Sequence, residues 1–335
     1  MSQITLTGIA KAYGTSVAIA PMDLTVADGE FLTLLGPSGC GKTTLMRMIA
    51  GITLPDQGAI RINGRDMAAL PPEKRNVGLV FQSYALFPHM TVAANVGFGL
   101  KMRGIARDAA AERVRAALAL VDLEPLAARY PRELSGGQQQ REALARAIVI
   151  EPDVLLLDEP LSNLDAKLRE HLREDLRNLQ QRLRVTAIYV THDQAEAMAL
   201  ADRIIVMDKG RIVEEGAPVD LYRAPQTRFA AEFLGQTNVV AVTAAGLLPW
   251  NTGVAGPADG MVSIRPEDIA VTPALDGAGR VLSLTFLGPA VEYRIDIGGT
   301  VLRARDSGTG TAILPQGTQV DLTLRVPPHP LQGVA

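Results

Sequence analysis

A glycine-rich segment, Gly36-Pro37-Ser38-Gly39-Cys40-Gly41-Lys42-Thr43-Thr44, has the residue types and spacing of a phosphate-binding loop. It lies between an apolar run at 31–35, predicted as a strand, and a helical pattern at 44–50. In such a loop the glycines let successive backbone N–H groups face the phosphates, and the helix N-terminus adds partial positive charge. Lys42 is expected to reach the β- and γ-phosphates, and the Thr43 hydroxyl to ligate Mg²⁺. The alternative is an ordinary glycine-rich turn.

Two acidic residues end the apolar run 154–157, which has the length of a buried strand. Asp158 and Glu159 therefore lie at the carboxyl end of a strand, where α/β sheets bind ligands. Because consecutive strand residues point in opposite directions, the two carboxylates cannot share one role. Asp158 is expected to bind Mg²⁺, and Glu159 to be the base that polarises the attacking water. Taken alone, the pair could be a solvated strand end.

A second glycine turn, Ser135-Gly136-Gly137-Gln138, follows Leu134. Ser135 and Gln138 have the spacing of a helix capping box, so a helix is predicted over 138–150. Two glycines at such a start weaken a helix by about 1 kcal/mol each relative to alanine. They are favourable where bare backbone must approach another molecule, and a simple helix cap stays open as the alternative.

Together the three motifs resemble those of the ATP-binding-cassette (ABC) ATPases, with Walker A at 36–44, the signature at 134–138 and Walker B at 154–159. The resemblance implies a P-loop α/β fold, ATP and Mg²⁺ as ligands, and a head-to-tail homodimer. In that dimer the signature of one chain contacts the γ-phosphate held by the Walker A loop of its partner. Ser135, Gly136, Gly137 and Gln138 are then nucleotide-binding residues, as are all nine residues of the Walker A loop.

The resemblance also assigns roles to residues that the sequence alone leaves open. Tyr13 matches the aromatic on which adenine stacks, whereas a core aromatic is the plainer interpretation. Gln82, at the end of a predicted strand, matches the Q-loop glutamine that touches Mg²⁺ or water and senses the transmembrane subunits; by itself it is a polar residue leaving a strand. His192 matches the switch histidine at the γ-phosphate, although a lone histidine is usually structural. Asp165 ends the D-loop 162–165 and is also a candidate helix N-cap.

One residue departs from the family pattern, and another lies at a position that the pattern leaves variable. Glu142 stands where an apolar residue is expected, and Cys40 occupies a variable position of the loop. Cys40 is the only cysteine, which excludes a disulfide within the chain and a cysteine-based metal cluster and fits a reducing cytoplasm.

The chain has 335 residues, of which 47% are hydrophobic, and a net charge of −3. It exceeds one ordinary domain, and its charge gives no indication of nucleic-acid binding. The sequence predicts neither a membrane span nor a secretion signal. We expect an ABC ATPase domain over 1–235, with a helical subdomain at about 87–150, and a second domain over 236–335. In the first domain, leucines at 168, 172, 176, 179 and 183 predict a helix that buries one face.

The second domain contains short runs rich in Val, Thr and Gly, at 261–264, 280–286, 291–297 and 320–326. They predict the strands of a small antiparallel barrel. The tail resembles the transport-associated OB-like domain of importer ATPases, with Arg265-Pro266-Glu267-Asp268 as its most recognisable element. Dimerisation, regulation by a ligand and plain stabilisation stay open as its role.

The resemblance implies ATP hydrolysis that drives solute import by a homodimer on the cytoplasmic face of the bacterial inner membrane. Two transmembrane permease subunits would contact the 84–100 region, and an external binding protein would deliver the solute; no nucleic-acid partner is expected. The runs at 138–141 and 233–238 and the short tail are most similar to polyamine or ferric-iron importers. The alternatives are an exporter and a soluble ABC ATPase of repair or translation, although the latter is expected to carry a coiled-coil insertion or a second cassette.

Overall fold

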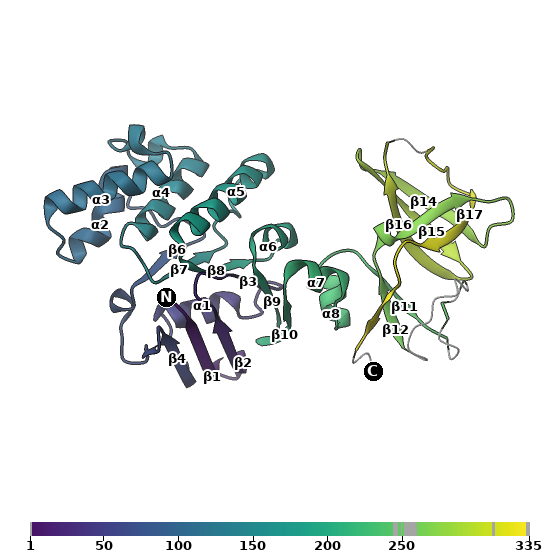
Figure 1. The fold of residues 1–335 in the computed structure, drawn as a ribbon, viewed down its shortest axis with the longest axis horizontal. Coiled ribbons are helices and arrows are strands. Elements are labelled where there is room, and N and C mark those ends of the chain that lie inside the picture. The colour runs from purple at the N-terminus through teal and green to yellow at the C-terminus, as the bar shows by residue number, and fades with distance from the viewer. Residues whose placement is uncertain (1, 244–246, 249, 251–259, 310–311, 333–335) are drawn as a thin grey trace. The chain divides into compact units, whose positions relative to one another are not determined.

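The computed structural model describes residues 2–243, 247–248, 250, 260–309 and 312–332. The chain divides into two compact units, Met1–Pro218 and Val219–Ala335 (Figure 1). Each unit has a hydrophobic core of its own. Within the described ranges, we find no helix with the length and apolar character needed to cross a membrane.

A mainly parallel sheet forms the centre of the first unit. Its strands follow one another in the order β10 (Arg211–Gly216), β9 (Arg203–Asp208), β3 (Phe31–Leu35), β8 (Thr186–Thr191), β7 (Val154–Asp158) and β6 (Val77–Val80). Only β10 runs antiparallel to its neighbour. β3 and β7 are buried along their whole length, which explains their continuous apolar sequences.

A smaller antiparallel sheet and one helix pack on one side of the central sheet. The sheet has the order β2 (Ser16–Val26), β1 (Ile4–Tyr13), β4 (Gln57–Ile62) and β5 (Arg65–Asp66). Helix α1 (Lys42–Ala50) shares a core with both sheets, and Gly51, in the left-handed conformation with φ of 81°, ends it. The loop before α1 is therefore held between buried elements.

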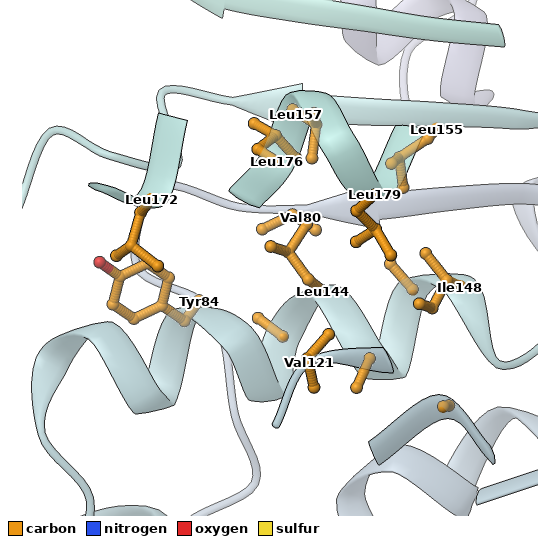
Figure 2. Close-up of a cluster of buried hydrophobic side chains, with 14 of the residues drawn as sticks. Val80, Tyr84, Val121, Leu144, Ile148, Leu155, Leu157, Leu172, Leu176 and Leu179 are labelled. Carbon is orange, nitrogen blue, oxygen red and sulfur yellow. The ribbon is translucent and has the colours of Figure 1, made fainter. Parts of the chain in front are cut away.

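The remaining helices of the first unit pack on the other side of its central sheet. They are α2 (Val92–Met102), α3 (Arg107–Leu120), α4 (Gly136–Ile148), α5 (Ala166–Leu183) and α6 (Gln194–Leu200), with short 3-10 helices at Glu124–Leu126 and Pro131–Glu133. A further 3-10 helix, Pro72–Lys74, lies beside α1 instead, because Arg75 at its end donates to the backbone oxygens of Met48 and Ile49. Figure 2 shows leucines of α4 and α5 meeting side chains of β6 and β7 in one cluster. The helical character of 87–150 is confirmed, while its standing as a separate subdomain stays a prediction.

The leucine pattern of α5 is confirmed except at its end. Leu172, Leu176 and Leu179 are buried, but Leu183 is 38% exposed. The expectation that Leu183 is buried was wrong because α5 ends at this residue, and Arg184 turns the chain away with φ of 51°.

The second unit is all-β apart from its first residues and one short 3-10 helix, Pro266–Asp268, as far as its residues are described. One sheet has the order β11 (Asn238–Ala241), β12 (Met261–Ile264) and β18 (His329–Leu331). The other has the order β13 (Ile269–Pro273), β17 (Gln319–Leu324), β14 (Gly279–Phe286), β15 (Ala290–Ile297) and β16 (Thr300–Ser307). Both sheets contribute to one core, and the predicted strands are confirmed to within two residues.

Two short helices, α7 (Pro218–Arg223) and α8 (Arg228–Phe233), belong largely to the second unit, whereas the sequence boundary was expected near 235. The buried Arg265 explains their attachment to the β sheets. Its guanidinium donates to the backbone oxygens of Tyr222 at 2.8 Å and Ala231 at 2.9 Å, and it stacks on the Tyr222 ring at 4.1 Å. Glu267 accepts a hydrogen bond from the Tyr222 hydroxyl. The Arg265–Asp268 element therefore fastens helices to sheets, a role that its sequence alone does not reveal.

Candidate nucleotide site

The phosphate loop joins β3 to α1 and is shaped by close backbone packing. A Cβ atom at Gly36 would lie 2.3 Å from the Met207 backbone oxygen, and one at Gly41 would lie 2.5 Å from that of Ala18. Gly41 also has φ of 108°, which disfavours any side chain. By contrast, nothing lies within 4 Å of a Cβ built on Gly39. The loop is thus packed against the protein at both ends and open at its centre, which fits a bound phosphate group.

Lys42 is buried at the first position of α1 and turns its ammonium group back into the loop. Nζ donates to the backbone oxygens of Gly36 at 2.7 Å and Pro37 at 3.0 Å. Cys40 Sγ lies 3.8 Å from the same nitrogen, and burial raises the pKa of its thiol. Ser38 is exposed beside them. The lysine ammonium group is therefore held where the loop is open, by hydrogen bonds to carbonyl oxygens. Phosphate oxygens can take the place of these carbonyl oxygens as acceptors.

Thr43 and Asp158 form a second contact across the loop. The Thr43 hydroxyl donates to Asp158 Oδ1 at 3.1 Å, at the carboxyl end of β7. Burial raises the pKa of the Asp158 carboxyl, and the bond from Thr43 opposes this rise. A hydroxyl and a buried carboxylate are oxygen donors of the kind that Mg²⁺ prefers, and a cation would offset the cost of burying the charge. The pair therefore fits a Mg²⁺ site.

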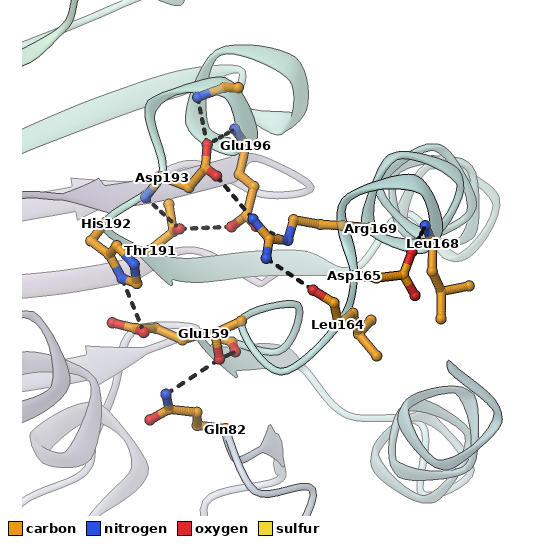
Figure 3. Close-up of polar contacts among 12 residues, drawn as sticks. Gln82, Glu159, Leu164, Asp165, Leu168, Arg169, Thr191, His192, Asp193 and Glu196 are labelled. Carbon is orange, nitrogen blue, oxygen red and sulfur yellow. Dashed lines mark hydrogen bonds and ion pairs between the residues drawn. The ribbon is translucent and has the colours of Figure 1, made fainter. Parts of the chain in front are cut away.

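Glu159 turns away from Asp158 and meets His192. Its backbone has φ of 44°, unusual for a residue with a side chain, and its N–H donates to Val190 of the neighbouring β8 at 3.0 Å. Glu159 Oε2 lies 3.1 Å from His192 Nδ1, which follows β8 (Figure 3). The two adjacent acids thus have separate partners, as the alternation of strand side chains predicts.

Gln82 lies with the D-loop rather than with the Thr43–Asp158 pair. Its side-chain amide donates to Ser162 Oγ at 3.3 Å, and its backbone oxygen accepts from Asn163 Nδ2 at 2.8 Å. Ser162 Oγ in turn donates to the backbone oxygen of Glu159 at 2.9 Å. Asp165 caps α5 by accepting from the N–H of Leu168 at 3.0 Å, which confirms the predicted N-cap.

The signature turn forms the predicted capping box. The N–H of Gln138 donates to Ser135 Oγ at 3.4 Å, and the N–H of Ser135 donates to Gln138 Oε1 at 3.0 Å. A Cβ atom on Gly136 would lie 3.2 Å from Leu164 Cδ2. One on Gly137 would lie 3.1 Å from a methyl carbon of Leu168. The glycine pair therefore also lets the turn lie close to the D-loop and the start of α5.

Tyr13 ends β1 and is exposed over 54% of its surface, and Lys11 Nζ lies 5.4 Å from the ring centroid. The interpretation as a core aromatic is therefore wrong, and the ring is free for stacking.

Sequence reasoning missed two arginines that join the loops around this site. Arg146 of α4 donates to the backbone oxygens of Tyr84 and Ala85, at 2.7 Å each. Both acceptors have positive φ, 59° and 47°, so Arg146 holds an unusual backbone turn just after Gln82. Arg169 of α5 contacts both the D-loop and the segment after His192. Apart from the bond of Arg169 to Leu164, these contacts are with residues remote in sequence, and no local pattern marks them.

Comparison with known proteins now places this site in a family. The ABC transporter family matches residues 19–162, and the TOBE domain family matches residues 262–328. The Fe(3+) ions import ATP-binding protein FbpC 1 of Rhizobium meliloti (strain 1021) is 46% identical over 331 residues, 92% of each chain. The Fe(3+) ions import ATP-binding protein FbpC of Agrobacterium fabrum is 47% identical over 303 residues, 86% of each chain.

The first unit also resembles a solved structure. A dimeric structure of a post-hydrolysis state of the ATP-binding cassette MJ0796, bound to ADP and Pi, is 31% identical and superposes with a TM-score of 0.58. The match covers 64% of this chain and 98% of that one.

The chain belongs to the ABC transporter family. It is an ATP-binding subunit of the importer type and carries a TOBE domain. The predicted fold class, a P-loop ATPase followed by a small all-β domain, is confirmed, and so is ATP hydrolysis coupled to transport, in preference to the soluble repair or translation alternative.

Proposed function

We propose that the chain powers the uptake of ferric iron, as a homodimer bound to two permease subunits on the cytoplasmic face of the inner membrane. The names of its relatives support this cargo over polyamines. The observation that carries the hydrolytic mechanism is the convergence of two pairs, Thr43 with Asp158 and Glu159 with His192, at neighbouring strand ends beside the phosphate loop.

The chain binds the triphosphate with the loop 36–44 and stacks adenine on the exposed Tyr13 ring. Lys42 exchanges its bonds to Gly36 and Pro37 for bonds to phosphate oxygens, so its charge faces the β- and γ-phosphates without leaving the loop. Thr43 Oγ1 and Asp158 are the residues that would hold Mg²⁺. When bound, Mg²⁺ neutralises the charge that develops on the phosphate oxygens.

Glu159 orients the attacking water and accepts its proton, and His192 holds the Glu159 carboxylate through Nδ1. Gln82 bonds Ser162 in this state, so it must leave the D-loop before it can touch the metal or the water. The signature residues Ser135–Gln138 supply donors to the nucleotide of a second copy, since in this chain their polar side chains bond only locally.

The base is tested by Glu159→Gln in the full-length chain. We expect ATP binding to persist while turnover falls by about 10²–10⁴, the usual contribution of a positioned base. Glu170→Gln, an exposed glutamate of α5, is the matched control. Turnover near that of the unaltered chain would remove Glu159 from this role.

The shared site is tested by Ser135→Arg. Because Ser135 acts on the partner's nucleotide, the variant should bind ATP as a monomer but fail to hydrolyse it. The similar MJ0796 cassette is dimeric with ADP and Pi, which supports the arrangement. Normal hydrolysis by Ser135→Arg contradicts it.

The permease contact is assigned to a groove of about 860 Å³ between α2 and α3. Its lining is mostly apolar and includes Met90, Gly97, Phe98 and Val114. An amphipathic helix from a permease fits such a groove. Val114→Asp should abolish co-purification with the permeases and leave basal ATP hydrolysis unchanged. If the variant still co-purifies with the permeases, the groove between α2 and α3 is not their contact site.

The cargo is tested through the binding protein that is expressed with this chain. We expect it to retain ferric iron and not spermidine when dialysed against each, followed by metal analysis and amine assay. If the binding protein retains spermidine alone, the cargo is a polyamine and not ferric iron. The proposed ATPase mechanism is unaffected by this result.

A further inference from the structure

Arg169 joins two loops of the nucleotide site (Figure 3). Its guanidinium NH2 donates to the backbone oxygen of Leu164, in the D-loop region, at 3.0 Å. NH1 lies 3.4 Å from Asp193 Oδ2, and Nε lies 3.8 Å from Glu196 Oε1. Asp193 directly follows His192, so one side chain connects the D-loop with the switch histidine.

The histidine side of this connection is a bonded network. Thr191 Oγ1 donates to Glu196 Oε2 at 2.7 Å and accepts from the N–H of Asp193 at 3.0 Å. Asp193 Oδ1 caps α6 by accepting from the N–H groups of Ala195 and Glu196, at 2.8 and 3.1 Å. Because the residues on both sides of His192 belong to the network, the histidine moves with it.

The D-loop side reaches the catalytic base and the signature. Ser162 bonds the backbone of Glu159, as described above. A Cβ atom added to Gly136 would lie 3.2 Å from Leu164 Cδ2, so the signature turn leaves little free space beside Leu164, and a displacement of the turn toward this side chain would press on it. Leu164 is buried, and its backbone oxygen is the atom that Arg169 holds.

One nitrogen of the Arg169 guanidinium, Nε, has an unused hydrogen-bond donor. Nε is buried and has no hydrogen-bond partner within the described ranges. A buried donor without a partner is unfavourable, and a movement of about 1 Å would bring Nε within bonding distance of Glu196 Oε1. Arg169 therefore has a second arrangement available, with a tighter contact to Glu196 and a looser one to Leu164.

We propose that Arg169 is a positioning residue that couples the D-loop to His192. When the D-loop meets a second copy of the chain and Leu164 shifts, the guanidinium exchanges contacts, and the segment 191–193 carries His192 toward or away from Glu159. The inference rests on the role proposed for His192 above.

The first test measures ATP hydrolysis by full-length variants. Arg169→Gln should lower kcat about tenfold and change KM for ATP by less than about twofold, because a charged hydrogen-bond contact is lost but no nucleotide contact is. Arg169→Lys should behave like Arg169→Gln, since one ammonium group cannot bridge Leu164 and two carboxylates. Lys167→Gln, exposed on the same helix, is the matched control.

The second test needs no nucleotide. Asp193→Asn keeps Oδ1 as the cap of α6 and removes the charge that faces Arg169. Hydrogen–deuterium exchange in the unliganded chain should become faster at 162–165, across the network, as well as at 193–196. Faster exchange at 193–196 alone shows no coupling and overturns the proposal, and so does full activity of Arg169→Lys.

A parallel measurement on His192→Ala separates this inference from the proposed function. Normal hydrolysis by His192→Ala removes the histidine from the mechanism. Loss of hydrolysis by His192→Ala together with unchanged kcat in Arg169→Gln and Asp193→Asn leaves the mechanism standing and overturns the coupling alone.

Discussion

Replacing Glu142 by glutamine should change how the free energy of unfolding depends on pH. Glu142 lies in α4 with an exposed fraction of 0%, and neither carboxyl oxygen has a hydrogen-bond partner in the part of the chain that the structure describes. Burial raises the pKa of this carboxyl from 4.5 to about 7, and the Arg146 guanidinium opposes only part of the rise. Ionising the Glu142 carboxyl group is therefore costly in the folded chain. The sequence pattern leads one to expect an apolar residue at this position.

The sign follows from proton binding. Between pH 4.5 and about 7 the folded chain keeps the Glu142 proton that the unfolded chain has released. Stability from this group is therefore fully present below pH 4.5 and is lost as pH rises to about 7. The raised pKa corresponds to a loss of at most about 3 kcal/mol in the free energy of unfolding between these pH values. Relaxation of the folded state or entry of water reduces this loss.

The assay is urea denaturation of the unaltered chain and of Glu142→Gln between pH 5 and 8. Glutamine cannot ionise, so the free energy of unfolding of Glu142→Gln minus that of the unaltered chain should rise with pH and level off above about pH 7. The exposed Glu170→Gln serves as control and should show no comparable rise. A difference for Glu142→Gln that is constant from pH 5 to 8 would refute the reasoning, whatever its size.

Three further changes test local packing. Gly41→Ala should abolish ATP binding in an equilibrium titration, because φ of 108° and the Ala18 oxygen at 2.5 Å exclude a Cβ; retained binding would show that the loop can shift. Asp165→Ala should lower the free energy of unfolding by about 1 kcal/mol in urea, the usual worth of an N-cap, and an unchanged midpoint would contradict this. Arg265→Lys should destabilise the second unit by about 2 kcal/mol or more, seen as an earlier thermal transition of the full chain, since lysine cannot bond several carbonyls at once.

The parts of the fold that sequence predicted well are those set by local chemistry. The buried strand β3 was predicted at its observed bounds because its apolar run stops where the glycine loop begins. The Ser135 and Asp165 caps were predicted because the N–H groups that donate to them, those of Gln138 and Leu168, lie three residues further along the chain. In each case the residues that determine the structure are neighbours along the chain.

What sequence missed depends on contacts between distant residues. The attachment of α7 and α8 to the second unit rests on Arg265, 43 residues after its acceptor Tyr222. The contact of Gln82 with Ser162 spans 80 residues, and the bond from Arg146 to Tyr84 spans 62. The family resemblance marks Gln82 and Arg265 but not their partners, and nothing in the local sequence distinguishes Arg146 from a solvated surface residue, so these contacts became visible only in the folded chain.

The site combines fixed and exchangeable parts, and the difference between them is physical. The phosphate loop is fixed because a side chain on Gly36 or Gly41 would overlap backbone atoms. Gln82, His192 and Ser135, by contrast, are exposed, and the side chain of each is held by one or two hydrogen bonds. Each such bond is worth about 0.5–1.5 kcal/mol, so a new contact with nucleotide or with a second chain can replace it at little cost. The residues expected to respond to ATP and to the partner chain are therefore the weakly held ones, and the loop 36–44, which we propose binds the triphosphate, is expected to keep its shape because of this backbone packing.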